Sequence, residues 1–390
     1  MPTFHTPPPP TAATGFTAPA ATLPAAMLSA RAPQGRRERT WPAVLVLFFL
    51  APAVGEMLSG STPPAMFVNP FSLLLETGLY GSGAVIAREL VRRRGLGWTS
   101  LLLLGAAYGI LEEGLTITSW FNPYWPDLQS LGSYGRLLDT NWVWALGLTI
   151  FHAVVSITIP ILLTETLFPH IAKRPWLGRR GLRGFVVWLS LISCFTLLAF
   201  GFLAYSRTVC TTQSHFTLCL PAYAHPPLMW FWALDLAIAL VALGLRLRGA
   251  QPAIQPTQPI QQLHTAPGLW RLRLSGLCGT VAFFFLLWVG PGIIPEAVVV
   301  MLLLAGLIVL VGWRVRRWAA RAGWGPEHRL ALATGALSFF LPLAPLLEFG
   351  EAHPGKTMTG MTLFALIWLA LFVVLARRAA WTTRLAMAQR

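Results

Sequence analysis

The sequence predicts an all-α bundle of about ten transmembrane helices, a polytopic integral membrane protein with both termini in the cytoplasm. Hydrophobic residues make up 55% of the 390 residues and charged residues only 11%, less than half of the rough quarter usual in soluble domains. So few charges cannot cover the surface of a soluble protein of this length. The net charge of +15 does not predict nucleic acid as a partner, because the basic residues lie between apolar runs.

Ten apolar stretches follow one another along the chain. They cover residues 42–58, 68–87, 98–117, 142–167, 184–205, 228–245, 274–290, 295–312, 330–348 and 358–376. Each is close to the roughly 20 residues that a helix needs to cross about 30 Å of hydrocarbon. Irregular backbone cannot face lipid, and the strands of a barrel would be shorter and would alternate in polarity. We therefore expect each stretch to be a spanning helix.

Composition divides the chain into five regions. Residues 1–40 are rich in Pro, Ala and Thr, which predicts a disordered cytoplasmic tail. A six-helix membrane segment over 41–248 comes next, and a Pro- and Gln-rich cytoplasmic linker over 249–269 follows it. A four-helix membrane segment over 270–376 leads to a basic cytoplasmic tail over 377–390.

The basic residues predict the orientation. When the connections are assigned alternately to two sides, 26 of the 29 Lys and Arg residues fall on one side. The other side has only Arg136, Arg207 and Lys356. The positive-inside rule makes the first side cytoplasmic. We expect a plasma (inner) membrane of bacterial type, with the lipid bilayer as the main partner.

The four cysteines form two groups. Cys194 and Cys278 lie inside predicted spans and are expected to be small packing residues. Cys210 and Cys219 lie in the 206–227 connection, which the charge count places outside the cell. An oxidising compartment favours a disulfide between this second pair.

Ionisable residues inside spans are costly there and are therefore the candidate catalytic residues. Glu112 and Glu113 lie in the outer third of their stretch, and His152 lies near the midplane of the next one, with Ser156 on the same helix face. Neighbouring residues on an α-helix are about 100° apart, so we expect only one of the two carboxylates to face the bundle interior. The depths of the carboxylates and the imidazole differ by about 6 Å, so a hydrogen bond, direct or through one water, is feasible.

Three more residues are candidates for binding a substrate or an ion. Glu76 and Asp235 each lie a turn or more inside apolar sequence, and Tyr108 continues a face of small residues that another helix can approach closely. Together with Glu112, Glu113 and His152 they predict an acidic cavity that opens outward. The aromatic outer loop 118–141 is typical of an interface belt, and a lid over a ligand is the alternative.

Two short segments carry a family resemblance. The pair Glu112-Glu113, followed 39 residues later by His152, loosely resembles the CAAX-processing and bacteriocin-processing intramembrane proteases. Those proteins carry Glu-Glu-x-x-x-Arg, then Phe-x-x-x-His, then a further His motif. Here Ile117 stands at the arginine position, Phe151 directly precedes His152, and the third motif has no match. The likeness covers about a tenth of the chain and implies an intramembrane protease as an alternative function.

Three functional classes remain open on the sequence alone. A transporter or permease leads, because intramembrane carboxylates are what coupling to protons or cations requires, and its substrate would be a small molecule or ion of unknown identity. An intramembrane hydrolase using the Glu pair and His152 is the alternative, and only under this alternative is a divalent metal cofactor expected. A structural membrane subunit without chemistry is the third class.

Overall fold

The computed structural model describes residues 39–203, 209–213, 216–220, 226–247, 265–350 and 358–388. The chain divides into two units, Met1–Arg39 and Thr40–Arg390, and the helices and strands of the described residues belong to the second unit. The predicted tail over 1–40 and linker over 249–269 lie almost wholly outside the described residues.

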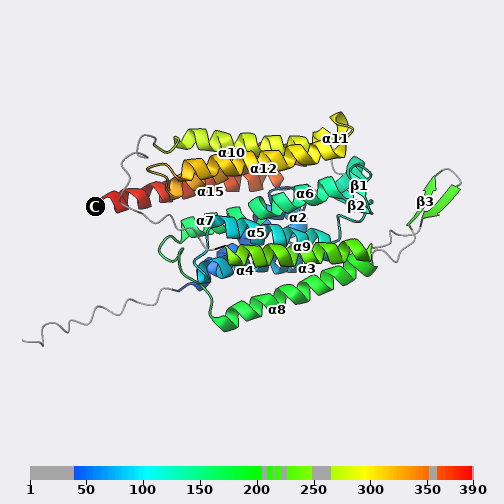
Figure 1. Ribbon diagram of the computed structural model, residues 1–390, viewed down its shortest axis with the longest axis horizontal. Coiled ribbons are helices and arrows are strands. Elements are labelled where there is room, and N and C mark those ends of the chain that lie inside the picture. The colour runs from blue at the N-terminus through cyan, green and yellow to red at the C-terminus, as the bar shows by residue number, and fades with distance from the viewer. Residues whose placement is uncertain are drawn as a thin grey trace, which may run out of the picture. The chain divides into compact units, whose positions relative to one another are not determined.

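Helices that run along a common direction make up the second unit (Figure 1). The first segment contains α1 (Trp41–Pro52), η2 (Ala53–Met57), α2 (Pro64–Phe67), α3 (Pro70–Glu76), η3 (Thr77–Gly81), α4 (Ser82–Arg93), α5 (Trp98–Gly109), η4 (Ile110–Thr116), η5 (Pro126–Gly132), α6 (Trp142–Phe151), η6 (His152–Thr158), α7 (Ile159–Leu167), α8 (Arg179–Thr196), η7 (Leu197–Leu203) and α9 (Pro227–Arg246). The second segment contains α10 (Leu269–Phe284), η9 (Phe285–Val289), α11 (Gly290–Ile293), α12 (Ala297–Ala319), α13 (Pro326–Leu337), α14 (Phe340–Phe349) and α15 (Met361–Ala388). Except for η5, which is a 3₁₀ turn, the η elements are π-helical turns that continue α-helices.

The predicted all-α membrane bundle is confirmed. All ten predicted stretches are helical, and seven helical runs among the described residues are long and apolar enough to cross a bilayer. The first three stretches are the exceptions to this length and hydropathy criterion. The run Trp41–Met57 is apolar but shorter, and the runs over 70–93 and 98–116 contain charged side chains and π-helical turns.

Side-chain caps begin two of the helices that carry the site. The side chain of Asn69 accepts a hydrogen bond from the backbone N–H of Phe71, and Pro70 occupies the first turn of α3. The side chain of Asn141 accepts from the backbone N–H of Trp144 at 3.0 Å and caps α6. Both caps satisfy amide groups that would otherwise lack partners at a helix start.

Two small hairpins lie in connections where the sequence predicts only loops. β1 (Arg136–Leu137) pairs with β2 (Thr140–Asn141), which leaves Leu138 and Asp139 as the turn. Both turn residues have positive φ, 52° and 56°, as a two-residue type I′ hairpin requires. The second hairpin pairs β3 (Val209–Gln213) with β4 (Phe216–Leu220).

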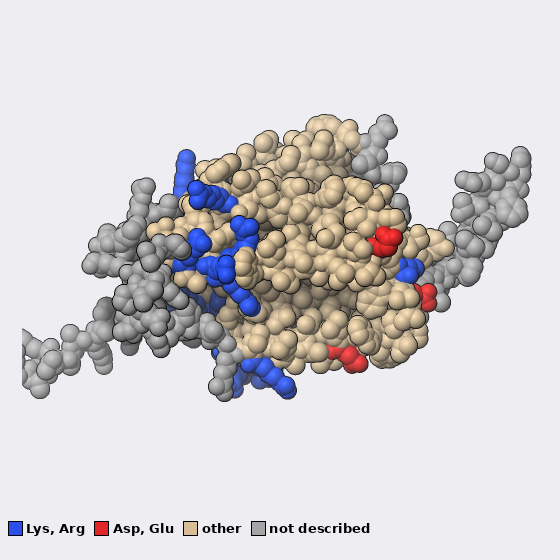
Figure 2. All heavy atoms as spheres, turned by 45° about the horizontal axis from the view of Figure 1, so that its top comes forward, with Lys and Arg blue, Asp and Glu red and all other residues tan. Residues whose placement is uncertain are grey.

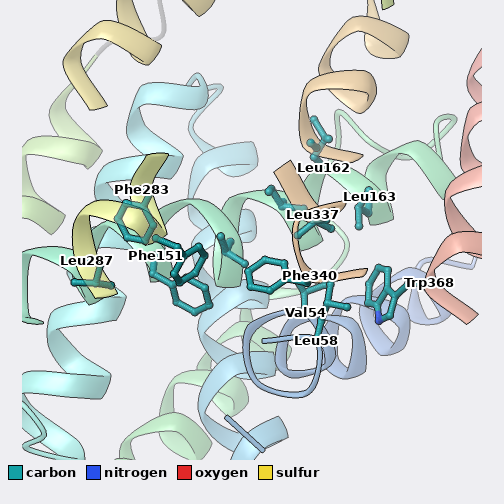
Figure 3. Close-up of a cluster of buried hydrophobic side chains, with 14 of the residues drawn as sticks. Val54, Leu58, Phe151, Leu162, Leu163, Phe283, Leu287, Leu337, Phe340 and Trp368 are labelled. Atoms are coloured by element: carbon teal, nitrogen blue, oxygen red, sulfur yellow. The ribbon is translucent and has the colours of Figure 1, made fainter. Parts of the chain in front are cut away.

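A shared hydrophobic core joins the two predicted membrane segments. Phe151 and Leu163 from the first segment belong to one cluster with Phe283, Phe340 and Trp368 from the second (Figure 3). The predicted four-helix segment therefore packs directly on the six-helix segment within one compact unit. The last helix, α15, continues to Ala388, beyond residue 376 where the sequence predicts its end.

Charged side chains are distributed unevenly along the helices. Figure 2 shows most of the visible Lys and Arg gathered toward one end of the visible face. The visible Asp and Glu lie toward the opposite end, where there is also a basic side chain. We call the first the basic end. This separation agrees with the distribution from which the orientation is predicted.

Near the basic end, a group of buried charges joins α4, α7 and the loop after α7. We call it the paired cluster; its members are Arg88, Glu89, Arg92, Glu165 and Trp176. The side chains of Arg88 and Glu89 are fully buried and form an ion pair at 2.9 Å. Arg88 also contacts Glu165 at 3.3 Å, and its guanidinium lies 3.4 Å from the ring centroid of Trp176. Glu89 in turn accepts from the backbone N–H of Trp176 at 2.7 Å. Every charge named here therefore has an opposite charge or a backbone partner.

Candidate functional site

A second group of buried polar residues lies away from the basic end. We call it the acidic cluster; its members are Glu56 on η2, Glu76 at the end of α3, Glu112 and Glu113 on η4, and His152 on η6. All five side chains line one cavity. Four of the five therefore lie on π-helical turns, a backbone form that is rare and occurs frequently at functional sites.

His152 is the centre of the cluster. Its Nε2 atom lies 3.2 Å from Oε2 of Glu112 and 3.1 Å from Oε1 of Glu113. Its Nδ1 atom lies 3.0 Å from Oγ of Ser156, the residue that the sequence predicts on the same helix face. The side chains of His152 and Glu112 are each 1% exposed, and that of Glu113 is 12% exposed.

The prediction that only one of the two adjacent carboxylates faces the interior is wrong. Both reach the same imidazole nitrogen. The reason is the wider turn of η4, in which the N–H of Ile117 donates to the carbonyl of Glu112, five residues earlier, at 2.8 Å. A wider turn reduces the angle between consecutive side chains, so the 100° spacing of an α-helix does not apply.

The carboxylate of Glu113 is held from its other side. The hydroxyl of Ser119 donates to Oε2 of Glu113, and the indole N–H of Trp144 donates to Ser119 Oγ at 3.1 Å. Ser119 reaches back because the chain reverses at Thr118, whose φ is 61°. Positive φ is unusual for a β-branched residue, and such conformations occur at functional sites.

A second carboxylate pair faces the same cavity. The Thr62 hydroxyl lies 3.0 Å from Oε2 of Glu56 and 3.0 Å from Oε1 of Glu76. The hydroxyl of Tyr80 donates to the other oxygen of Glu56. A threonine hydroxyl has a single hydrogen and can donate to only one carboxylate. Both contacts are satisfied when the other carboxyl group carries a proton and donates to Thr62.

The cavity has a volume of about 150 Å³, enough for several water molecules or a small chemical group. Besides the acidic cluster, Trp125 and Asp127 of the aromatic loop contribute to its lining, and so do Thr196 of α8 and Phe200 of η7. No Lys or Arg is among the described residues that line it. The cavity therefore favours a cation, a proton or a neutral polar group.

The predicted site residues have different locations. Tyr108 is buried beside the cluster, where its ring contacts those of Tyr80 and His152, but it does not line the cavity. Asp235 lies on the exposed side of α9 and does not line the cavity either. The structure therefore brings Glu76, Glu112, Glu113 and His152 together and leaves Asp235 apart.

The side chains of Cys210 and Cys219 lie outside the described residues. The backbone register of the β3–β4 hairpin places these two residues directly opposite each other. Cys194 and Cys278 are free and exposed, so the prediction that they pack in the interior is wrong for these described positions.

Four residues that complete the site are not among its predicted members: Glu56, Thr62, Tyr80 and Ser119. Glu56 was available as an acid at the end of the first span, yet such a position is also typical of an interfacial residue. Thr62 and Ser119 are connected to the cluster only by turns after a helix end, for which the sequence has no periodic signal. Their hydroxyls show that polar residues just beyond the end of a span can complete a site inside the bundle.

A family model described as an uncharacterized membrane protein family matches residues 45–389. The chain belongs to that family. An uncharacterized protein of Archaeoglobus fulgidus is 27% identical over 193 residues, which cover 42% of this chain and 59% of the relative. The chain thus matches less than two thirds of this curated relative's length. No solved structure matches the chain.

Family membership fixes the coarse character of the protein. It is a multi-pass membrane protein whose helices lie in a lipid bilayer. This family membership assigns no reaction or substrate. The chemistry must therefore be argued from the acidic cluster.

Proposed function

We propose that the protein is an intramembrane hydrolase that activates water at Glu112, Glu113 and His152. One observation carries the proposal: a single imidazole nitrogen lies within 3.2 Å of two carboxylates on the wall of a polar cavity. Carboxylates and imidazoles are the usual general acids and bases, and they act at such hydrogen-bonding distances. The short resemblance to the CAAX-processing proteases involves the same three residues.

The reaction is the addition of water to a carbonyl group. A carboxylate or the imidazole of the cluster takes one proton from a cavity water as the water oxygen bonds to the carbonyl carbon. The bond from that carbon to the leaving nitrogen or oxygen then breaks, and the protonated side chain returns its proton to the leaving group. The products are a carboxylic acid and an amine or alcohol.

The helices next to the acidic cluster are densely packed. This packing favours an enzyme with a fixed site over a transporter whose site opens alternately to the two sides of the membrane. A Cβ atom added at Gly83 would lie 2.4 Å from the ring of Tyr108, and one added at Gly105 would lie 2.9 Å from the Cα atom of Ala153. The rings of Tyr80 and Tyr108 are in edge contact with each other. Helices this close leave no passage toward the basic end at these positions.

The cavity wall supports a substrate that resides in the membrane. Thr196 and Phe200 line the cavity from the α8–η7 helix, which runs along the edge of the bundle (Figure 1). Only 11% of its apolar window is buried, so most of its surface is available to lipid. We infer an ester or amide bond in a membrane-embedded molecule as the substrate class.

A hydrolysis assay in proteoliposomes tests the proposal. Quenched fluorogenic long-chain esters and model transmembrane peptides are offered to the wild-type protein, Glu113→Gln, His152→Ala and the control Asp235→Asn. Loss of a general acid or base should slow hydrolysis by at least about 100-fold, whereas the control, outside the cavity, should retain its rate. Equal background rates for wild type and both site variants on every substrate would contradict the proposal.

A transporter remains the second candidate because of the Glu56–Thr62–Glu76 arrangement. A proton shared by two carboxylates is a suitable element for proton or cation coupling. In this case vesicles should show substrate-dependent proton uptake without new products, and Glu76→Gln should abolish this uptake.

The third candidate is a structural subunit without chemistry. Neither assay should then respond to these variants, and a buried carboxylate such as Glu112 would destabilise the protein without serving a function.

We further propose a plasma membrane with both termini in the cytoplasm, which places the β3–β4 hairpin outside the cell. Opposite residues of antiparallel strands have Cα atoms about 4.5–5.5 Å apart, within the range of a disulfide. Cys210 and Cys219 should therefore be oxidised in protein purified without reductant. Thiol titration by mass spectrometry that finds both residues free would contradict this assignment.

A further inference from the structure

The distances around His152 suit a metal ion as well as hydrogen bonds. The candidate ligand atoms of Glu112, Glu113 and His152 all lie within 4.8 Å of one another, and two of the separations are 3.2 and 3.1 Å. Zn²⁺ binds nitrogen and oxygen ligands at about 2.0–2.2 Å in a tetrahedron, so neighbouring ligands are roughly 3.3 Å apart. The two separations from Nε2 of His152 to the carboxylate oxygens already have nearly this spacing.

Hydrogen bonds alone do not satisfy the three groups. The Nε2 atom of His152 can carry one hydrogen, and only its contact with Glu113 has hydrogen-bonding geometry. Oε2 of Glu112, at 3.2 Å from the same nitrogen, is buried and has no hydrogen-bond partner among the described residues. A buried carboxylate oxygen without a donor is expensive. A cation bound between the three ligand atoms removes that cost.

The surroundings are those of a metal centre. Metal-binding histidines usually engage their second nitrogen in a hydrogen bond that fixes the ring, and metal-binding carboxylates are held in the same way. Here Ser156 lies 3.0 Å from Nδ1 of His152, and Ser119, itself held by Trp144, donates to the second oxygen of Glu113. Both orienting contacts use the far atom of each side chain, and they leave Nε2 of His152 and Oε1 of Glu113 next to each other at 3.1 Å.

Charge also favours a divalent ion. Two carboxylates and a neutral imidazole carry two negative charges, and the described lining of the cavity includes no Lys or Arg to balance them. One divalent cation neutralises the group in a low-dielectric position where uncompensated charge is costly.

We propose that Glu112, Glu113 and His152 bind a divalent metal ion of the zinc type through one carboxylate oxygen each and Nε2. The inference deepens the hydrolase proposed above and rests on it for its chemistry. Three protein ligands leave a fourth position for a water molecule, the arrangement of catalytic zinc sites. The metal lowers the cost of deprotonating that water. With the metal bound, these three side chains would be ligands, so the carboxylate of the acidic cluster that takes the proton would be Glu56 or Glu76, which line the same cavity.

Metal analysis of the full-length protein tests the site directly. The protein is purified in detergent through a tag without histidine, stripped with a chelator, incubated with Zn²⁺ or Co²⁺ and passed over a desalting column. About one ion per chain should remain, and bound Co²⁺ should have the visible absorption of a tetrahedral complex. His152→Ala and the double variant Glu112→Gln/Glu113→Gln should lose the ion, whereas the exposed Asp235→Asn should keep it.

Two outcomes would overturn the metal site. One is wild-type protein that retains no ion, and the other is a His152→Ala variant that binds as much as wild type. The Co²⁺ spectrum of the wild-type protein tests the metal site even where a variant fails to fold. The two proposals can fail separately. Hydrolysis by metal-free protein would contradict the metal site but not the hydrolase. Binding of one ion per chain without hydrolysis of any substrate would contradict the hydrolase but not the metal site.

Discussion

The paired cluster and the acidic cluster are both groups of buried ionisable side chains, but they are satisfied differently. In the paired cluster, Arg88 and Glu89 neutralise each other, Arg88 also contacts Glu165, and backbone groups of the 168–178 loop take further hydrogen bonds. In the acidic cluster, Oε2 of Glu112 has no donor among the described residues. The four carboxylates of the cluster face a cavity whose described lining also includes Asp127 but only one histidine and no Lys or Arg. A saturated network stabilises the fold, whereas an unsaturated one beside a cavity is available to a ligand.

Removing the buried cation of the paired cluster should give the largest loss of stability. Arg88→Met leaves Glu89 and Glu165 without their shared partner, and breaking a buried pair costs about 3–5 kcal/mol. The midpoint of thermal unfolding in detergent should fall strongly. Arg94→Met, at an exposed position next in sequence to the cluster, should leave it nearly unchanged. An equal midpoint for both variants would show that the paired cluster is not structural.

Neutralising Glu89 should have the next largest effect. Glu89→Gln keeps the size of the side chain but leaves the buried Arg88 charge less compensated and weakens hydrogen bonds from the amides of Trp176 and Leu177. Hydrogen bonds to charged groups contribute about 1.5–3 kcal/mol. We expect a loss of this size in the free energy of unfolding, measured by denaturation in mixed micelles, together with protease cleavage in the 168–178 loop. A fully protected loop would contradict the role given to Glu89.

A methyl group added at Gly105, where α5 packs against η6, should reduce the free energy of unfolding by a smaller amount. Gly105→Ala puts a Cβ atom 2.9 Å from the Cα atom of Ala153, and overpacking a close contact costs about 1–3 kcal/mol. The same change at Gly306, where nothing lies within 4 Å, is the matched control and should not destabilise. Because η6 carries His152, Gly105→Ala should also weaken metal binding by the protein that remains folded. A variant that only lowered the overall stability would leave the folded protein with wild-type metal binding.

The smallest effect on stability is expected where the effect on function is largest. Glu112→Gln removes a charge that has no full partner, so the free energy of unfolding should change by less than about 1 kcal/mol, while metal retention and hydrolysis are lost. This is the same substitution as Glu89→Gln in the other cluster. A stability loss as large as that of Glu89→Gln would erase the distinction between the two clusters.

The sequence predicts the bundle well because length and hydropathy are local properties of each span. The contact between Glu112, Glu113 and His152 was predicted from the cost of ionisable groups at similar depth, and Ser156 from its position one turn after His152. Glu56 and Tyr80 could not be assigned in this way, because their contact depends on how α1 packs against η3. The prediction that only one of Glu112 and Glu113 faces the interior is wrong, because the spacing rule for an α-helix does not hold in a π-helical turn.

Those wide turns make the protein sensitive to single-residue deletions. A π-helical turn contains one residue more than the α-helix it interrupts, so the run from α6 through η6 to α7 has an extra residue within Trp142–Leu167. Deleting Val154 would allow a continuous α-helix and rotate all of α7 by about 100° relative to α6. Glu165, on α7, would then leave its arginines at the basic end. An insertion or deletion at the site therefore rotates every later residue of the same helix. The number of residues between His152 and Glu165 must stay the same if the acidic cluster and the paired cluster are both to keep their contacts.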